Sequence, residues 1–336
     1  MRPALLRFRR SSPEGLAADL ADRVIGQPQA MRQIVPYVEM YQAGLAPDGR
    51  PAGVFLLLGP TGTGKTRTVE ALAEVLHGTP RHLLRVDCGE FQMEHEVAKL
   101  IGAPPGYLGH RETTPMLTQQ KLASATSESS SLALVLFDEI EKAAPSMTRL
   151  LLGVLDKATL RLGDNTSVNF ERTMIFLTSN LGAREMHREL CPDFGFAVAA
   201  GAPVGEPAKK LEAIGMQAVR RKFAPEFVNR IDAVITYQPL NQAALETIVD
   251  QQIADLEQHI QNRLGDDAFE LEVADSAREF LLRTGTSAEY GARELKRAIL
   301  KHLTQPIASL VARGEIGAGA TLRVDAAALR LVLTVE

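Results

Sequence analysis

The stretch Gly59-Pro60-Thr61-Gly62-Thr63-Gly64-Lys65-Thr66 decides the fold of this chain. It has the spacing G-x-x-x-x-G-K-[ST] of a loop that binds the phosphates of a nucleoside triphosphate. Its glycines let the backbone curl so that successive N–H groups face a phosphate chain. Lys65 would place a positive charge on the β- and γ-phosphates, and the Thr66 hydroxyl would ligate Mg²⁺. We therefore expect residues 59–66 to bind ATP together with Mg²⁺.

The sequence on either side of the loop supports this interpretation. Residues 53–58 form a short apolar run, which favours a buried parallel strand. Residues 66–76 carry apolar side chains at helical spacing, so the expected order is strand, loop and helix. A phosphate would then lie at a helix N-terminus, where the helix dipole and free N–H groups favour an anion.

Strand-like and helical segments alternate through the first two thirds of the chain, which predicts an α/β fold with a parallel sheet. Five strands are expected, over residues 53–58, 82–86, 132–137, 173–178 and 233–237. After Pro239 the pattern becomes mostly helical, with Asn241 as a helix N-cap and a short β-like tail. We predict a tail with the start of a helix over 1–20, a large ATPase domain over 21–239 and a small domain over 240–336.

Composition narrows the function classes. The chain has 336 residues and a formal net charge of −4, which argues against a nucleic-acid-binding surface. Its two cysteines, Cys88 and Cys191, indicate a reducing compartment, and its histidines lack the spacing of metal ligands. No stretch reaches the roughly 18 apolar residues of a membrane span. The expectation is a cytoplasmic protein that binds neither nucleic acid nor membrane.

Two further segments supply candidate catalytic residues. Residues 132–137 are apolar and lead directly into Asp138 and Glu139, at the sheet edge where ligands bind in open α/β folds. Asp138 would hold Mg²⁺, and Glu139 would polarise the attacking water. An acidic helix start stabilised by the dipole is the alternative. Asn180 follows another apolar strand and would contact the γ-phosphate or the water, unless it only favours a turn.

The loop at residues 59–66, the strand that ends in Asp138 and Glu139, and the strand followed by Asn180 resemble, in this order, the AAA+ superfamily. Four other segments narrow the resemblance to the second ATPase module of the Clp unfoldases ClpB, ClpA and ClpC. They are residues 22–27 (adenine-pocket entry), 101–109 (central-pore loop), 225–232 (arginine-finger segment) and 290–295 (sensor 2). The fold that this resemblance implies is an AAA+ P-loop NTPase domain followed by a smaller, mostly helical lid domain with a short β element.

The resemblance also implies roles for particular residues. Val24 and Ile25 would pack on the adenine. Arg230 would reach the nucleotide of a neighbouring subunit, and Arg293 would contact the γ-phosphate from the small domain of the same subunit. An arginine supplied to a transferring phosphoryl group accelerates the reaction by about 10³–10⁵. If Arg230 acts in trans, the chain works as a ring, which in this family is a homohexamer.

The expected substrate follows from residues 106–109, where Tyr107 and Leu108 stand between two glycines. In Clp-type rings this tyrosine grips an unfolded polypeptide in the pore. The sequence departs from the family's pattern, because Leu108 replaces the usual valine and residues 110–114 replace a glycine-rich stretch. The expected function is an ATP-dependent unfoldase or remodelling chaperone that acts on unfolded or misfolded proteins, directly or through an adaptor.

Three alternatives remain open at this point. The stretch Asp193-Phe194-Gly195-Phe196 matches, with an aromatic first position, the tripeptide that docks Clp-type peptidases, so the chain could be the ATPase subunit of a protease. It could instead be a non-threading AAA+ assembly switch. A clamp- or helicase-loader-like ATPase is the third alternative, and the acidic balance argues against it. Only about 20 residues precede Val24, too few for the N-terminal domain and first ATPase module of full-length Clp proteins. We therefore expect a single-ring protein or a fragment.

Overall fold

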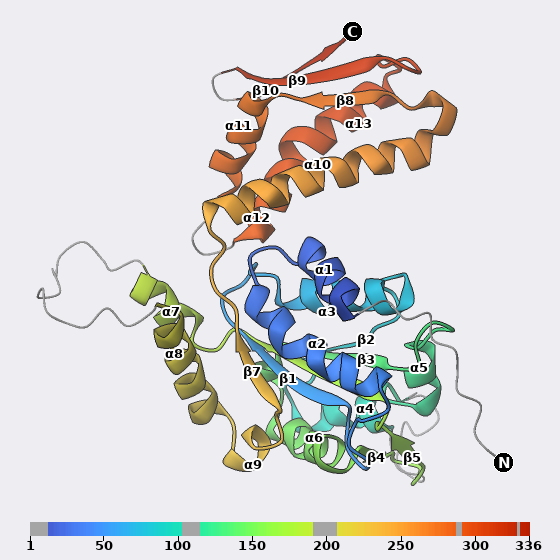
Figure 1. The fold of residues 1–336 in the computed structure, drawn as a ribbon, viewed down its shortest axis with the longest axis vertical. Coiled ribbons are helices and arrows are strands. Elements are labelled where there is room, and N and C mark those ends of the chain that lie inside the picture. Colours follow the sequence, from blue (N-terminus) through green and yellow to red (C-terminus); the bar gives the residue numbers. More distant parts are fainter. Residues whose placement is uncertain (1–12, 103–114, 191–206, 287–290, 328–329) are drawn as a thin grey trace, which may run out of the picture. The chain divides into compact units, whose positions relative to one another are not determined.

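The computed structural model describes residues 13–102, 115–190, 207–286, 291–327 and 330–336 (Figure 1). The chain divides into two compact units. The first contains residues 1–59 and 64–238, and the second contains residues 60–63 and 239–336. Each unit has its own hydrophobic core.

The first unit is built around a five-stranded parallel sheet with the order β2-β3-β6-β1-β7. Its strands are β1 (Gly53–Leu58), β2 (Leu84–Asp87), β3 (Ala133–Asp138), β6 (Thr173–Ser179) and β7 (Ala233–Thr236). The predicted α/β fold with a five-stranded parallel sheet is confirmed. Strands β1 and β6 are buried along their whole length, as their unbroken apolar runs predict.

Helices and a hairpin complete the first unit. The α-helices are α1 (Pro13–Arg23), α2 (Pro28–Gln42), α3 (Lys65–His77), α4 (Ala98–Ile101), α5 (Gln119–Ser124), α6 (Pro145–Lys157), α7 (Ala183–Leu190), α8 (Pro207–Lys222) and α9 (Pro225–Val228). Short 3₁₀ turns are η1 (Cys88–Glu90), η2 (Glu94–Val97) and η3 (Ile140–Lys142). Strands β4 (Thr159–Arg161) and β5 (Ser167–Asn169) form a two-stranded antiparallel sheet that the sequence analysis did not predict.

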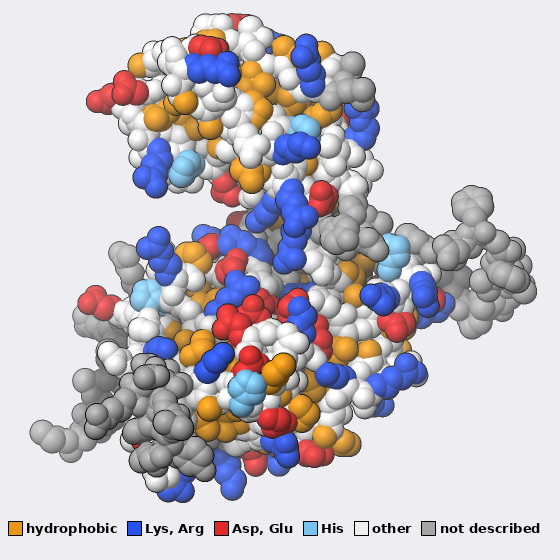
Figure 2. All heavy atoms as spheres, turned by 180° about the vertical axis from the view of Figure 1, so that it is seen from behind, with side chains coloured by type: hydrophobic (Ala, Val, Ile, Leu, Met, Phe, Trp, Pro, Cys, Tyr) orange, Lys and Arg blue, Asp and Glu red, His pale blue; other side chains and the backbone are white. Residues whose placement is uncertain are grey.

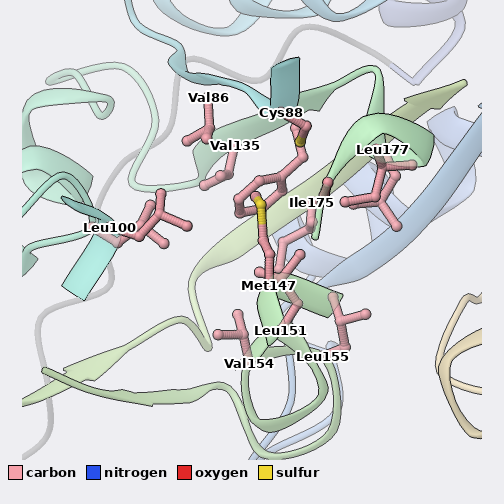
Figure 3. Packing of buried hydrophobic residues seen from close by; sticks show 14 of the residues in the cluster. Val86, Cys88, Leu100, Val135, Met147, Leu151, Val154, Leu155, Ile175 and Leu177 are labelled. Atoms are coloured by element: carbon pink, nitrogen blue, oxygen red, sulfur yellow. The ribbon is translucent and has the colours of Figure 1, made fainter. Parts of the chain in front are cut away.

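The two faces of the five-stranded sheet carry separate cores, because successive side chains of a strand point to opposite faces. In β1, Val54, Leu56 and Leu58 belong to the core that α6 covers (Figure 3). Phe55 and Leu57 belong to the other core, which α1, α2 and α3 cover. There the rings of Phe55 and Phe176 stack with 5.3 Å between their centroids. Burial of both faces fixes the register of β1 and therefore the position of the loop that follows it.

The second unit packs helices against a three-stranded sheet with the order β10-β9-β8. Its elements are α10 (Gln242–Leu264), η4 (Gly265–Asp267), β8 (Glu270–Val273), α11 (Asp275–Gly285), α12 (Ala292–Ile299), the π-helical turn η5 (Leu300–Thr304), α13 (Gln305–Ala312), β9 (Thr321–Ala327) and β10 (Arg330–Val335). The Asn241 side chain accepts a hydrogen bond from Ala244 N at 2.9 Å and so caps α10. This mostly helical unit with a short β element matches the fold expected for the small domain.

Within the described residues, no helix is both long enough and apolar enough to cross a membrane.

Candidate functional site

The loop after β1 has the backbone that its glycines permit. Gly59, Gly62 and Gly64 have φ values of +142°, +78° and +100°. A Cβ on Gly59 would lie 2.6 Å from the Tyr237 carbonyl oxygen, so no larger residue fits there without a shift. Gly64 is the N-cap of α3 in the left-handed conformation. The Thr63 hydroxyl donates to the Pro60 carbonyl at 2.9 Å, while Thr61 and Thr66 are half-buried.

Lys65 begins helix α3 and is buried, with 8% of its surface exposed. Its ammonium group donates to the Gly59 carbonyl oxygen at 2.7 Å and to Asn180 Oδ1 at 2.9 Å. A buried charge is tolerated only with such partners. Two of the predicted site residues, Lys65 at the start of α3 and Asn180 directly after β6, are thus in direct contact.

Asp138 is the last residue of β3, and its carboxylate has two partners. The Thr178 hydroxyl donates to Asp138 Oδ1 at 2.5 Å, and the Arg85 guanidinium on β2 pairs with Oδ2. Strand pairing sets Asp87 beside Asp138 in register, so a second carboxylate ends the adjacent strand. The carboxylate of Asp138 is therefore held at the edge of the sheet where its strand ends.

Glu139 has an unusual backbone. Its φ and ψ are 56° and 49°, in the left-handed region that non-glycine residues rarely adopt. Its amide donates to the Thr178 hydroxyl at 3.0 Å, and its carbonyl accepts from the Lys142 amide at 2.9 Å. Its carboxylate accepts from Asn180 Nδ2 at 3.3 Å and from Lys142 Nζ at 2.5 Å. Backbone conformations of this kind cost about 1–3 kcal/mol and cluster at functional sites.

Asn180 connects the loop to the carboxylate of Glu139. Its side chain accepts a hydrogen bond from Lys65 and donates one to Glu139. Its backbone amide donates to Glu141 Oε1 at 3.0 Å. The other carboxylate oxygen of Glu141 is buried and makes no hydrogen bond. The structure thus brings four predicted site residues together. Lys65, Asn180 and Glu139 form a chain of hydrogen bonds, and Asp138 is linked to Glu139 through the Thr178 hydroxyl.

Acidic and basic side chains gather on the first unit in the view of Figure 2.

Burial, followed by the charges of Asp87, Asp138, Glu141 and Glu139, raises the pKa of the Cys88 thiol. Cys88 is buried and therefore stays a neutral thiol, which fits a packing role.

The donor set suits Mg²⁺ held jointly with phosphates. Among the described residues, no group of three or more His, Cys, Asp or Glu side chains could hold a metal ion. Mg²⁺ is usually bound through one or two carboxylates plus substrate phosphates rather than by an all-protein cage. The strand-end carboxylate of Asp138, together with the half-buried Thr66 at the start of α3, fits that pattern.

The residues predicted for the adenine lie between α1 and α2. Val24 is buried in the core that α1, α2 and α3 cover, and Ile25 is half-buried. The Gln27 side chain exchanges hydrogen bonds with the Gln238 backbone, donating at 2.8 Å and accepting at 3.3 Å. This pairing ties the segment to the chain that follows β7.

The remaining predicted residues are not part of this network. Arg230 is exposed after α9 and pairs with Asp156 of α6, with 3.1 Å between Nη1 and Oδ1. Arg293 is exposed in the first turn of α12, in the second unit. Tyr107, Leu108 and the 193–196 stretch lie outside the described residues.

Sequence reasoning missed three contributors to the site, namely Arg85, Lys142 and Thr178. Thr178 stands two residues before Asn180, next to the last residue of β6, which neighbours β3, so the expected sheet could have suggested it. Lys142 stands three residues after Glu139, a spacing at which side chains meet on one turn. Arg85 gave no local signal, because its partner Asp138 is 53 residues away in sequence.

Comparison with known proteins agrees with this geometry. The family model described as the AAA domain (Cdc48 subfamily) matches residues 50–234, more than half of the chain. The chain belongs to this family. The model of the C-terminal, D2-small domain of ClpB protein matches residues 240–324, so the AAA domain here is followed by a Clp-type small domain.

Similar proteins include the chaperone ClpB, the protease subunit ClpC and Hsp104. The chain is 39% identical over 313 residues to the chaperone protein ClpB of Rhizobium meliloti, covering 93% of this chain and 33% of the relative. It is 37% identical over 306 residues to the ATP-dependent Clp protease ATP-binding subunit ClpC of Staphylococcus saprophyticus, covering 91% and 35%. It is also similar to the S. cerevisiae Hsp104:casein complex, with a TM-score of 0.79 and 29% identity, covering 94% and 51%. The chain thus spans about a third of the length of these curated relatives.

Proposed function

We propose that this AAA module hydrolyses ATP and uses the energy to unfold or remodel proteins. The observation that carries the ATPase part is the contact chain from Lys65 through Asn180 to Glu139, because it joins the phosphate loop to a carboxylate. The remodelling part is supported by similarity to the chaperone ClpB and to a structure of Hsp104 with the protein casein.

Each residue of the network has a task in this proposal. Lys65 binds the terminal phosphates, and Glu139 orients and polarises the attacking water. Asn180 links Glu139 to Lys65 through its side-chain amide. Thr66 and Asp138 would hold Mg²⁺, which when bound neutralises the charge on the phosphates.

We infer that the working form is a ring of identical subunits. Arg230 is exposed and lies outside the network of its own subunit, which is what an arginine supplied to a neighbour requires. Arg293 and the pair Val24–Ile25 are proposed to contact the γ-phosphate and the adenine of the same subunit. Light scattering with ATP tests this inference: a hexamer is expected, and a monomer under conditions that support hydrolysis would contradict it.

The substrate-threading role rests on Tyr107 and Leu108, and one experiment separates it from a switch that only docks partners. The Tyr107→Ala variant should retain ATP hydrolysis within about twofold and lose ATP-dependent unfolding of a tagged fluorescent protein. The loss of fluorescence measures unfolding directly. Equal loss of hydrolysis and unfolding, or unfolding at the wild-type rate, would contradict the threading role.

A second candidate function is the ATPase subunit of a protease. It is favoured by the similarity to ClpC, whose name includes a Clp protease, and by residues 194–196. Adding a Clp-type peptidase to the unfolding assay distinguishes the two functions. Degradation of the tagged protein supports the protease subunit, whereas release of intact unfolded protein supports the chaperone.

A further inference from the structure

Lys142 forms a close ion pair with the proposed catalytic carboxylate. Its Nζ lies 2.5 Å from Glu139 Oε2, and the two side chains are 48% and 35% exposed. Lys142 follows Glu139 by three residues, and the short η3 turn between them brings the two residues together. The Lys142 amide donates to the Glu139 carbonyl. Local geometry therefore presents this lysine to this carboxylate.

The sheet order shows in which direction Lys142 holds the carboxylate. Glu139 follows β3, which lies between β2 on one side and β6 on the other. Asn180 follows β6, on the side toward β1 and Lys65. The Lys142 side chain instead lies beside Gly89, which follows β2, since a Cβ on Gly89 would be 3.9 Å from Lys142 Cδ. Lys142 and Asn180 thus hold Glu139 from opposite sides.

The distances show which of the two donors lies closer. Lys142 is 2.5 Å from Oε2, whereas Asn180 Nδ2 is 3.3 Å from Oε1. A charge-assisted bond at the shorter distance is the stronger of the two. The Glu139 backbone is meanwhile fixed by its contacts with Thr178 and the Lys142 amide. Any approach of the carboxylate toward Asn180 and Lys65 must therefore come from the side chain.

We propose that Lys142 is a positioning residue that restrains Glu139 on the β2 side of its strand and must release it for hydrolysis. The inference deepens the proposed function and rests on the role of Glu139 in it. Because the pair is partly exposed, the restraint is weak enough to be reversible, as exposed ion pairs typically contribute little. Its removal should accelerate the reaction about two- to fivefold.

The test compares three single variants in the full chain. Lys142→Met removes the charge, Lys142→Arg keeps it, and Lys210→Met is the matched control. Lys210 is an exposed lysine on α8 that pairs with Glu189 at 3.0 Å, away from the site network. For each protein, kcat and KM for ATP, the affinity for a fluorescent ATP analogue and the thermal midpoint are measured.

The expected result is a two- to fivefold higher kcat for Lys142→Met, with nucleotide affinity within twofold of wild type. Lys142→Arg and Lys210→Met should match wild type. A structural role alone would lower the thermal midpoint and kcat together. Should Lys142→Met fail to fold, Lys142→Gln replaces it with the same expected gain.

Three results would overturn the inference. An active wild type with unchanged or lower kcat in Lys142→Met and normal nucleotide affinity rejects the restraint and leaves the proposed ATPase intact. Equal gains for Lys142→Met and Lys142→Arg reject the charge as its cause. A wild-type chain without ATPase activity overturns the proposed function and the inference together.

Discussion

Helix α3 has a buried ionisable residue at each end, and the two are treated differently. Lys65 at its N-terminus is 8% exposed, and His77 at its C-terminus is 7% exposed. Lys65 donates to a carbonyl and to Asn180 Oδ1. One ring nitrogen of His77, Nδ1, is 2.9 Å from the Ser127 hydroxyl, while Nε2 is buried and makes no hydrogen bond of ordinary geometry.

The difference shows what kind of burial indicates function. At the N-terminus a charge is surrounded by acceptors and connected to Glu139. At the C-terminus burial lowers the pKa of His77 to about 4, assisted by the nearby His82 and partly offset by the Leu132 backbone. The first end holds a charge, which we propose binds phosphate, whereas the second end keeps its side chain neutral for packing.

The largest effect is expected from Lys65→Ala. The variant removes the ammonium group that would bind the phosphates. Because charge-assisted hydrogen bonds between this group and ATP are lost, the affinity for ATP should fall about a hundredfold or more. Equilibrium binding of a fluorescent ATP analogue measures the change. Lys210→Ala, which removes an exposed paired lysine of the same unit, is the control and should bind as wild type does.

Unchanged affinity in Lys65→Ala would remove the distinction between the two ends of α3. The loop would then be a structural turn, and the contact of Lys65 with Asn180 would serve packing only.

A smaller effect is expected at His77, and it depends on pH. Its pKa in the folded state, about 4, lies below the value of 6.5 expected in the unfolded chain. Between these values the unfolded state binds more protons, so stability falls as the pH falls from 6.5 toward 4. At pH 5 the wild type should have lost on the order of 2 kcal/mol relative to pH 7 through this residue.

Urea denaturation of wild type and His77→Gln at pH 7 and pH 5 measures this contribution. The glutamine keeps a polar partner for Ser127 but does not titrate. The stability difference between the two proteins should shift in favour of the variant at pH 5. The same pH dependence in both proteins would show that folding does not change the pKa of His77.

Most of the main sheet could be predicted because β1, β3 and β6 are almost continuous apolar runs. The five strands of the main sheet lie within a few residues of the expected positions, and β2 begins at Leu84 rather than at residue 82. The β4–β5 hairpin was missed, since its strands have only three residues each. Its loop, in which Asn165 has a φ of +69°, contains turn residues that could have indicated it.

The candidate site was only partly predictable. The loop, Asp138 and Glu139 follow local patterns in the sequence. The contact of Lys65 with Asn180 and the pair Arg85–Asp138 depend on which strands are neighbours, which no local pattern reveals. The left-handed backbone of Glu139 was likewise unexpected, because tertiary contacts with Thr178 overrule its local preference.

In the proposed mechanism Glu139 acts on the attacking water while Lys65 binds the phosphates, and the Glu139→Gln variant separates these two roles. The variant should bind ATP within twofold of wild type and hydrolyse it at least about a hundredfold more slowly, the contribution of a positioned general base. Glu189→Gln, which alters an exposed paired carboxylate, is the matched control and should keep full activity. Measured together, ATP affinity and kcat of Glu139→Gln decide the question. Hydrolysis at the wild-type rate would contradict the account.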